Sequence, residues 1–282
     1  MTEIRKEDYE EPNCPLLDPS TGQPQSCGGG TIPVMRVLEK LDAYCGKEDY
    51  AAAERHLLYW IAEADALGDA RGAFSLANEL MGYYRKQGKK EEAVAWAQNA
   101  LTRMEALDYA QTPSGATCCV NCGTVYDAFG MPEEAIRFFE KAQAVYEAAE
   151  HRENKLLGGL YNNMALTLVD LARYDEAETY YGKALDCMAQ VEHGELEQAI
   201  TWLNRADAAV LKDGAAASQE EIAGYLEQAK ALLETPTVPR NGYYAFVLEK
   251  CAPAFYCHGD AAYGEVIETR AKELYAANRN TE

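Results

Sequence analysis

The feature that most constrains the fold of this chain is an internal repeat. Residues 80–101, 122–143 and 164–185 align with one another without a gap, and each segment lies 42 residues after the one before it. In every copy an alanine follows a glutamate, and a second alanine comes seven residues later. These pairs are Ala93 and Ala100, Ala135 and Ala142, and Ala177 and Ala184. Small side chains two turns apart on one helix face let another helix approach closely, so the repeat predicts packed pairs of helices.

The rest of the chain extends this pattern. Apolar residues recur at helical spacing from residue 31 to residue 278, with a diverged first copy over residues 31–69 and a longer inner loop around Gly214. Residues 1–30 differ, because they contain four prolines and a glycine run and show no apolar period. We therefore expect a flexible N-terminal arm over residues 1–30, an all-α array over residues 31–278 and a short C-terminal tail over residues 279–282.

The copy that begins at Cys122 resembles the tetratricopeptide repeat (TPR). It carries the family's two aromatic positions, its turn glycine and its three small positions, at Gly123, Tyr126, Gly130, Ala135, Phe139 and Ala142. The next copy departs at the turn, where Ala172 stands in place of glycine. The period of 42 residues also exceeds the family's usual length of about 34 residues. The resemblance implies a long-repeat TPR protein, an all-α, right-handed superhelical solenoid of about six helix-turn-helix repeats whose first helices line a concave groove.

That groove is where the resemblance places a ligand. On a helical wheel of about 100° per residue, the side opposite the core carries Asn121, Asn163 and Asn204 in successive copies, with Asn78 as a weaker member one copy earlier. A side-chain amide has both donors and an acceptor in one plane, which matches the backbone of an extended peptide. The asparagines therefore predict peptide binding, and the alternative is that they bond neighbouring helices to each other. Three hydrophobic neighbours are predicted to contact the ligand's side chains: Leu166, Ile200 and Leu211.

The charge of the chain excludes some partners. Its 46 acidic and 26 basic side chains give a formal net charge of −20, whereas nucleic acids and anionic membranes require a basic surface. No apolar stretch approaches the roughly 18 to 20 residues that span a bilayer, and the N-terminus lacks the apolar segment of a signal peptide. We therefore expect a cytoplasmic protein that binds neither nucleic acid nor membrane. The acidic residues are expected to solvate the outer helices, with the steering of a basic partner as the alternative.

Other candidate sites receive less support. Cys118, Cys119 and Cys122 form a C-C-x-x-C sequence, but Cys119 and Cys122 take core positions of the repeat, and no second pair of ligands completes a zinc site. The four histidines lie in different copies, with no carboxylate or serine at a catalytic spacing, and no phosphate-binding glycine loop is present. We therefore expect no enzyme activity, no bound metal and no cofactor.

Two hypotheses about function follow from this pattern. The first is a scaffold or adaptor that holds a protein or peptide segment in the groove through the asparagine ladder. The second is a structural assembly protein that forms a homodimer through the ends or the outer surface of the array, with its groove empty or filled by residues 1–30. The end of the array near residue 278 has little chain left for a polar capping helix, which favours the second hypothesis.

Overall fold

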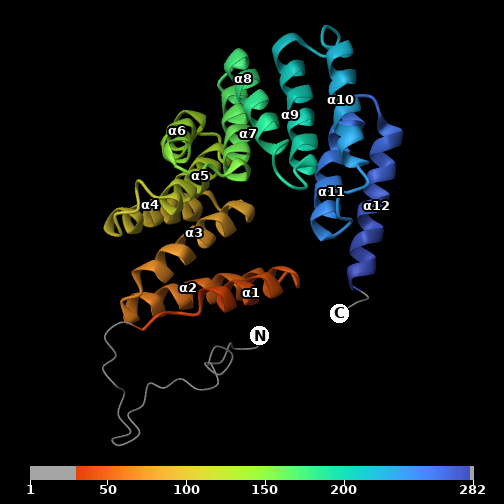
Figure 1. Cartoon of the computed structure of the whole chain (residues 1–282). Coiled ribbons are helices and arrows are strands. Elements are labelled where there is room, and N and C mark those ends of the chain that lie inside the picture. Colours follow the sequence, from red (N-terminus) through yellow and green to blue (C-terminus); the bar gives the residue numbers. More distant parts are fainter. Residues whose placement is uncertain (1–29, 280–282) are drawn as a thin grey trace, which may run out of the picture. The chain divides into compact units, whose positions relative to one another are not determined.

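A computed structural model describes residues 30–279, and in this range the protein consists of α-helices without any strand (Figure 1). The expected N-terminal arm, apart from Gly30, and residues 280–282 of the expected tail lie outside the described residues. The helices are α1 (Val34–Cys45), α2 (Tyr50–Leu67), α3 (Ala70–Lys86), α4 (Lys90–Ala106), α5 (Pro113–Ala128), α6 (Pro132–Ala148), α7 (Asn154–Asp170), α8 (Tyr174–Met188), α9 (Glu195–Asp213), α10 (Gln219–Leu233), α11 (Gly242–Cys257) and α12 (Ala261–Arg279).

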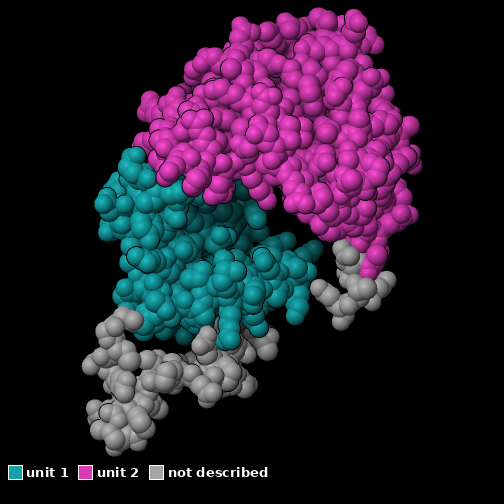
Figure 2. Space-filling model, in the orientation of Figure 1, with its two compact units in different colours: residues 1–125 teal, residues 126–282 magenta. Residues whose placement is uncertain are grey.

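The chain divides into two compact units, which are described separately below (Figure 2). Unit 1 is Met1–Val125 and unit 2 is Tyr126–Glu282, so that the boundary falls within α5. In unit 1, α3 packs against both α2 and α4. In unit 2, α9 contacts both α7 and α11, so these three first helices lie in one row, and α8, α10 and α12 each pack against the first helix of their own pair. This is the arrangement of stacked helix pairs that the repeat predicts.

The period of the repeat is confirmed by where its second helices begin. The helices α4, α6 and α8 begin at Lys90, Pro132 and Tyr174, at the same spacing of 42 residues that the sequence shows. The longer inner loop lies where it was expected, because α9 ends at Asp213 and α10 begins only at Gln219. All six alanines of the alignment are completely buried. A larger side chain at any of these positions would push neighbouring helices apart.

A left-handed backbone residue joins the two helices of several pairs. Gly130 has φ of +72° between α5 and α6, and the backbone N–H of Met131 donates to the carbonyl oxygen of Tyr126. Ala172 occupies the same place between α7 and α8 with φ of +56°. Alanine adopts this conformation only at an energetic cost, because its Cβ comes too close to the backbone. Ala172 therefore replaces the family's turn glycine, while the turn keeps its left-handed conformation.

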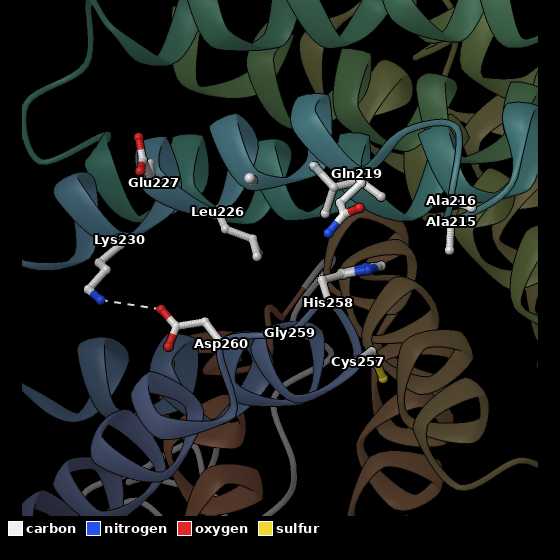
Figure 3. Close-up of a pocket in the computed structure, with 12 residues that line it drawn as sticks. Ala215, Ala216, Gln219, Leu226, Glu227, Lys230, Cys257, His258, Gly259 and Asp260 are labelled. Carbon is white, nitrogen blue, oxygen red and sulfur yellow. Dashed lines mark hydrogen bonds and ion pairs between the residues drawn. The ribbon is translucent and has the colours of Figure 1, made fainter.

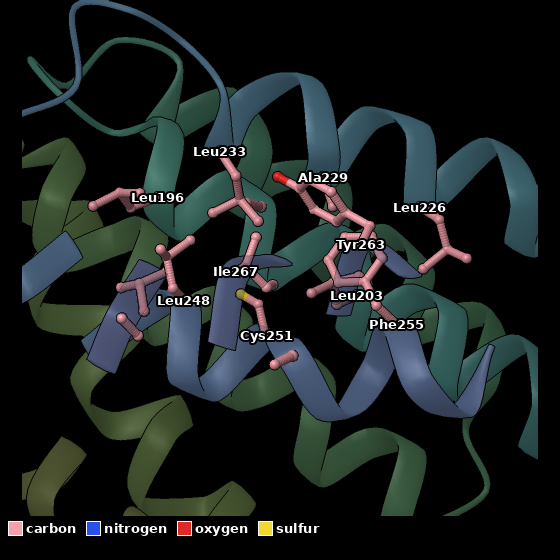
Figure 4. Packing of buried hydrophobic residues seen from close by; sticks show 14 of the residues in the cluster. Leu196, Leu203, Leu226, Ala229, Leu233, Leu248, Cys251, Phe255, Tyr263 and Ile267 are labelled. Atoms are coloured by element: carbon pink, nitrogen blue, oxygen red, sulfur yellow. The ribbon is translucent and has the colours of Figure 1, made fainter. Parts of the chain in front are cut away.

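A large buried cluster of unit 2 lies among the last two helix pairs. Phe255 and Tyr244 of α11 are fully buried there, together with Leu233 of α10 and Ile267 of α12 (Figure 4). The ring of Tyr263 meets the ring of Phe255 edge to face at a centroid distance of 4.8 Å. Burying large side chains of this kind stabilises each helix pair by several kcal/mol, of the order of 2 per side chain. The cluster fixes which side of α9 and α11 faces the interior and which side is left to solvent.

Candidate functional site

The first helices of unit 2 present one accessible face. On α9 the side chains at spacings of three and four residues, from Glu197 to Leu211, are half-buried or exposed, whereas Leu196, Ala199 and Leu203 between them are buried. The same spacing recurs on α7 and α11. We call these three stripes the first-helix face: Leu156, Gly159, Asn163, Leu166 and Asp170 on α7; Glu197, Ile200, Asn204, Asp207 and Leu211 on α9; and Tyr243, Phe246, Lys250, Pro253 and Cys257 on α11.

The hydrophobic residues predicted to contact a ligand all lie on this face. Leu166 and Ile200 are half-buried, and Ile200 also packs against the core cluster of unit 2. Leu211 is much more open, with 61% of its surface exposed. A side chain that is anchored on one side and accessible on the other can contact a ligand without a large loss of conformational entropy. Ile200 meets this condition better than Leu211.

A cavity of about 260 Å³ lies between α9 and α11 on the same face. Ile200, Asn204 and Asp207 contribute its α9 side, and Lys250, Pro253 and Ala254 contribute to its α11 side. Its lining therefore combines apolar side chains with an amide and two opposite charges. We call this cavity the α9–α11 notch. It has room for one hydrophobic side chain of a partner, but not for a whole small molecule of ordinary size.

Two exposed aromatic side chains lie beside Lys250 on α11. Tyr243 and Phe246 are 48% and 45% exposed, and their rings stack at a centroid distance of 6.3 Å. The Tyr243 hydroxyl donates to Glu197 Oε1 at 2.9 Å, and Lys250 Nζ lies 5.3 Å from the centre of the Phe246 ring. Burial and the neighbouring Glu197 raise the pKa of Tyr243 to about 12, so its hydroxyl stays a donor at neutral pH. The helical spacing that places Ile200 and Asn204 on α9 would also have found both rings.

The predicted asparagines are distributed between the two compact units. In unit 1, Asn121 Nδ2 donates to Asn78 Oδ1 at 3.4 Å, and Asn78 Nδ2 donates to the carbonyl oxygen of Phe74 at 3.0 Å. In unit 2, Asn204 Nδ2 donates to Asn162 Oδ1 at 3.1 Å. The Asn121–Asn78 and Asn204–Asn162 bonds join neighbouring first helices, which is the structural alternative stated for the ladder, whereas the bond from Asn78 to Phe74 lies within α3. Each bond uses only part of an amide's capacity, since the amide carries two donor hydrogens and an acceptor oxygen.

Asn163 differs from the other three asparagines. It is half-buried on the first-helix face, and its amide makes no side-chain hydrogen bond within residues 30–279. Its neighbour Asn162 instead accepts the bonds from α9, from Asn204 and from the hydroxyl of Thr201 at 3.2 Å. The gap-free alignment pairs Asn121 with Asn163, but on α7 the structural role passes to Asn162. The whole amide of Asn163 is consequently available to a ligand.

A second, larger cavity lies at the C-terminal end of α11. It has a volume of about 680 Å³ and is lined by the α9–α10 loop, one side of α10 and the turn from α11 to α12 (Figure 3). Lys230 Nζ lies 3.3 Å from Asp260 Oδ2 across it. His258, at the α11 end of this cavity, has Nε2 2.7 Å from Asp207 Oδ1 and so ties this turn to α9.

The cysteines of α5 are buried, as expected for packing. Cys118, Cys119 and Cys122 are at most 5% exposed, and the Cys122 sulfur lies 4.0 Å from the sulfur of Met81. A hydrogen bond with the Cys122 thiol lowers the pKa of Cys118. Within residues 30–279 no group of three or more histidine, cysteine or acidic side chains is placed to hold a metal ion.

Comparison with known proteins agrees with this architecture. The sequence profile described as the tetratricopeptide repeat matches residues 72–148, and a second profile of the same description matches residues 158–192. The chain is a tetratricopeptide repeat protein. These matches cover both copies from which the resemblance was inferred, so the prediction of family and fold class is confirmed.

Solved structures resemble this TPR protein in fold. BtubC (BKLC) from P. vanneervenii has 20% sequence identity and a TM-score of 0.52, over 79% of this chain and 92% of that one. A structure of nearly identical TPR-like repeats from Podosopora anserina has 16% identity and a TM-score of 0.51, over 72% of this chain and 95% of that one. No curated protein sequence matches the chain significantly. Identities this low show a shared fold only.

Membership of this family indicates the general function of the chain. TPR arrays are typically non-enzymatic scaffolds for protein–protein interaction, and this chain has their architecture. Among residues 30–279, no helix is both long and apolar enough to cross a membrane.

Proposed function

We propose that this TPR protein is a scaffold or adaptor that binds a peptide segment of another protein on its first-helix face. The observation that carries the proposal is the α9–α11 notch, which is lined by Ile200 and Asn204 and lies on the same face as the exposed rings of Tyr243 and Phe246. An apolar depression with a few polar groups around it is the usual form of a site for an anchoring side chain. Exposed aromatic residues next to such a depression are typical of protein interfaces.

Each predicted residue has a role in this proposal. Ile200, together with Leu166 and Leu211, contacts the hydrophobic side chains of the ligand. Asn163 and Asn204 bond the ligand's backbone, Asn163 with its whole amide and Asn204 with the donor and acceptor that the bond to Asn162 leaves. Asn78 and Asn121 have the same role in unit 1, where their mutual bond of 3.4 Å is long enough to yield to a better partner.

The proposal includes the protein's setting and chemistry. The partner is a protein or peptide in the cytoplasm, and neither a nucleic acid nor a membrane, because a chain with a net charge of −20 repels both. Binding needs no metal or cofactor and involves no catalysis, since only shape, hydrogen bonds and apolar contact are used.

The test is selection from a display library of random peptides with the full chain, followed by measurement of Kd for the selected peptides. Asn163→Ala is the sharpest variant, because it removes an amide without breaking a hydrogen bond of the fold. We expect it to weaken binding about three- to tenfold, as loss of one or two ligand hydrogen bonds implies. Asn99→Ala on α4 removes an amide from a second helix, where it bonds Arg103, and should leave Kd unchanged.

The hypothesis of a homodimeric assembly protein makes a different prediction. Light scattering would give twice the monomer mass, and display selection would return no peptide whose binding depends on Asn163. These two results together would support the assembly function and contradict the scaffold function.

A further inference from the structure

Two carboxylates stand at the α7 and α9 side of the first-helix face. Asp170 is the last residue of α7, and it makes no ion pair within residues 30–279. Asp207 lies on α9 at the rim of the notch, with its side chain 59% exposed. The carbonyl groups at the C-terminal end of α7 add a partial negative charge next to Asp170. The two acids therefore make this part of the face electronegative.

The hydroxyl of Tyr181 lies in the electrostatic field of the same two carboxylates. This α8 residue is buried, and its oxygen has no hydrogen-bond partner among the described residues. Burial raises the pKa of Tyr181, the charges of Asp207, Asp170 and Glu178 raise it further, and the charge of Arg205 opposes them. Both carboxylates therefore act on a single buried group, which places their negative potentials in one region of unit 2.

The first-helix face carries fewer positive groups than negative ones. Lys250 lies at the α11 side of the notch, where its ammonium group contacts the Phe246 ring instead of a carboxylate. His258 is bonded to Asp207, and Glu197 is bonded to Tyr243. The acids of the face thus outnumber its lysine, in a chain whose net charge is −20. A positively charged partner is attracted to this surface over a distance of about 10 Å at moderate ionic strength.

We propose that the preferred ligand is a peptide segment in which a hydrophobic residue is followed or preceded by lysine or arginine. The hydrophobic side chain enters the α9–α11 notch against Ile200 and Pro253, and the basic side chain lies between Asp170 and Asp207. This inference rests on the proposed function, and it adds the chemical class of the partner. Lys250 disfavours the opposite orientation of the bound peptide, because it repels a basic side chain placed on the α11 side.

The experiment uses three fluorescent peptides of equal length, each with a central leucine. The leucine is flanked by lysines in the first, by serines in the second and by glutamates in the third, and binding to the full chain is followed by anisotropy. We expect the lysine peptide to bind at least tenfold more tightly than the glutamate peptide. The difference should shrink as salt is added, because ions screen exposed charges.

The acid pair is tested with Asp170→Asn/Asp207→Asn. Two exposed ion pairs are lost, so the lysine peptide should bind about three- to tenfold more weakly while the serine peptide is unaffected. The matched control is Glu140→Gln/Glu273→Gln, which removes the same charge from exposed positions on α6 and α12. Asp170→Asn alone checks that the loss does not come from breaking the bond between Asp207 and His258.

The exposed ring next to the notch is tested with Phe246→Ser. Phe246 is 45% exposed beside Lys250, and Val266 on α12 is 50% exposed on a second helix, so Val266→Ser is the control for loss of an apolar surface side chain. Binding of all leucine peptides should weaken in the first variant only.

Three outcomes would overturn the inference. The glutamate peptide could bind most tightly, the three peptides could bind equally, or the control charge variant could weaken binding as much as Asp170→Asn/Asp207→Asn. In each case the scaffold function stands if display selection returns peptides that depend on Asn163. If selection returns none, the function itself fails.

Discussion

At the scale of single residues, most positions obey the repeat, and the exceptions are informative. The alanines that let helices approach are buried as the spacing predicts, because any larger side chain would not fit. Ala172 is an exception, since it holds a left-handed conformation that the family assigns to glycine. Asn163 is another, because its amide is free while Asn162 beside it bonds to α9.

Ala172→Gly should stabilise the protein. Glycine relieves the strain of φ at +56°, and part of this gain is lost to the greater freedom of the unfolded chain. The expected net gain is about 0.5–1 kcal/mol in the free energy of unfolding, measured by urea denaturation. Ala144→Gly, at an exposed interior position of α6, should instead cost about 1 kcal/mol. Equal destabilisation by both substitutions would contradict the assignment of strain to Ala172.

The α5 cysteines should behave as core residues and not as metal ligands. A strong chelator should leave the thermal unfolding midpoint unchanged. Cys122→Ser should lower the free energy of unfolding by about 1–3 kcal/mol, because a hydroxyl is harder to bury than a thiol. A midpoint that falls on chelation and recovers with zinc would show that the sulfurs hold a metal.

At the scale of helices, hydrogen-bonded side chains tie neighbouring pairs together beyond their apolar contacts. In unit 1, Glu54 of α2 accepts from Lys89 Nζ at 2.7 Å and from the Tyr84 hydroxyl at 3.0 Å. The bond from Lys89, together with that from Tyr84, lowers the pKa of Glu54. The network links α2 to the end of α3 and to the turn that follows it.

This network predicts how stability depends on pH. A carboxyl group whose pKa is lower in the folded state stabilises the protein above its unfolded pKa, and that stabilisation is lost as pH falls through the folded pKa. The free energy of unfolding should therefore decline below about pH 4.5. Glu54→Gln should remove a few tenths of a kcal/mol of this decline, since the group is partly exposed and screened by solvent. Glu39→Gln on α1 is the control, and an equal change in both variants would refute a special role for Glu54.

At the scale of the whole molecule, stability is built from helix pairs that contact mainly their neighbours in sequence. The last first helix, α11, packs on α9 and α12. Removal of α11 together with α12 therefore exposes one interface without disturbing the pairs before α9. The division of the chain into two compact units also reflects this packing between sequence neighbours, because the chain can be divided inside α5 with most contacts kept within each part.

A chain that ends at residue 240 should remain helical. Loss of α11 and α12 uncovers the α9 and α10 side of the core cluster, including Leu196 and Leu233. We expect a lower unfolding midpoint and a urea m-value reduced with the surface lost, but nearly unchanged helicity per residue by circular dichroism. Complete loss of helicity would show that cooperativity extends over the entire array.

The sequence by itself determined the all-α class, the period and the buried alanines, because helical packing imposes a fixed spacing on small side chains. It also placed Ile200 and Asn204 on an accessible face. Tertiary structure decided the rest. Only the contact between α9 and α11 creates the notch, and only the contact between α7 and α9 gives the interhelix bond to Asn162 instead of Asn163. Helical periodicity tells which way a side chain points, whereas a cavity or a hydrogen bond depends on how far apart two helices lie, and that distance is set by all the side chains packed between them.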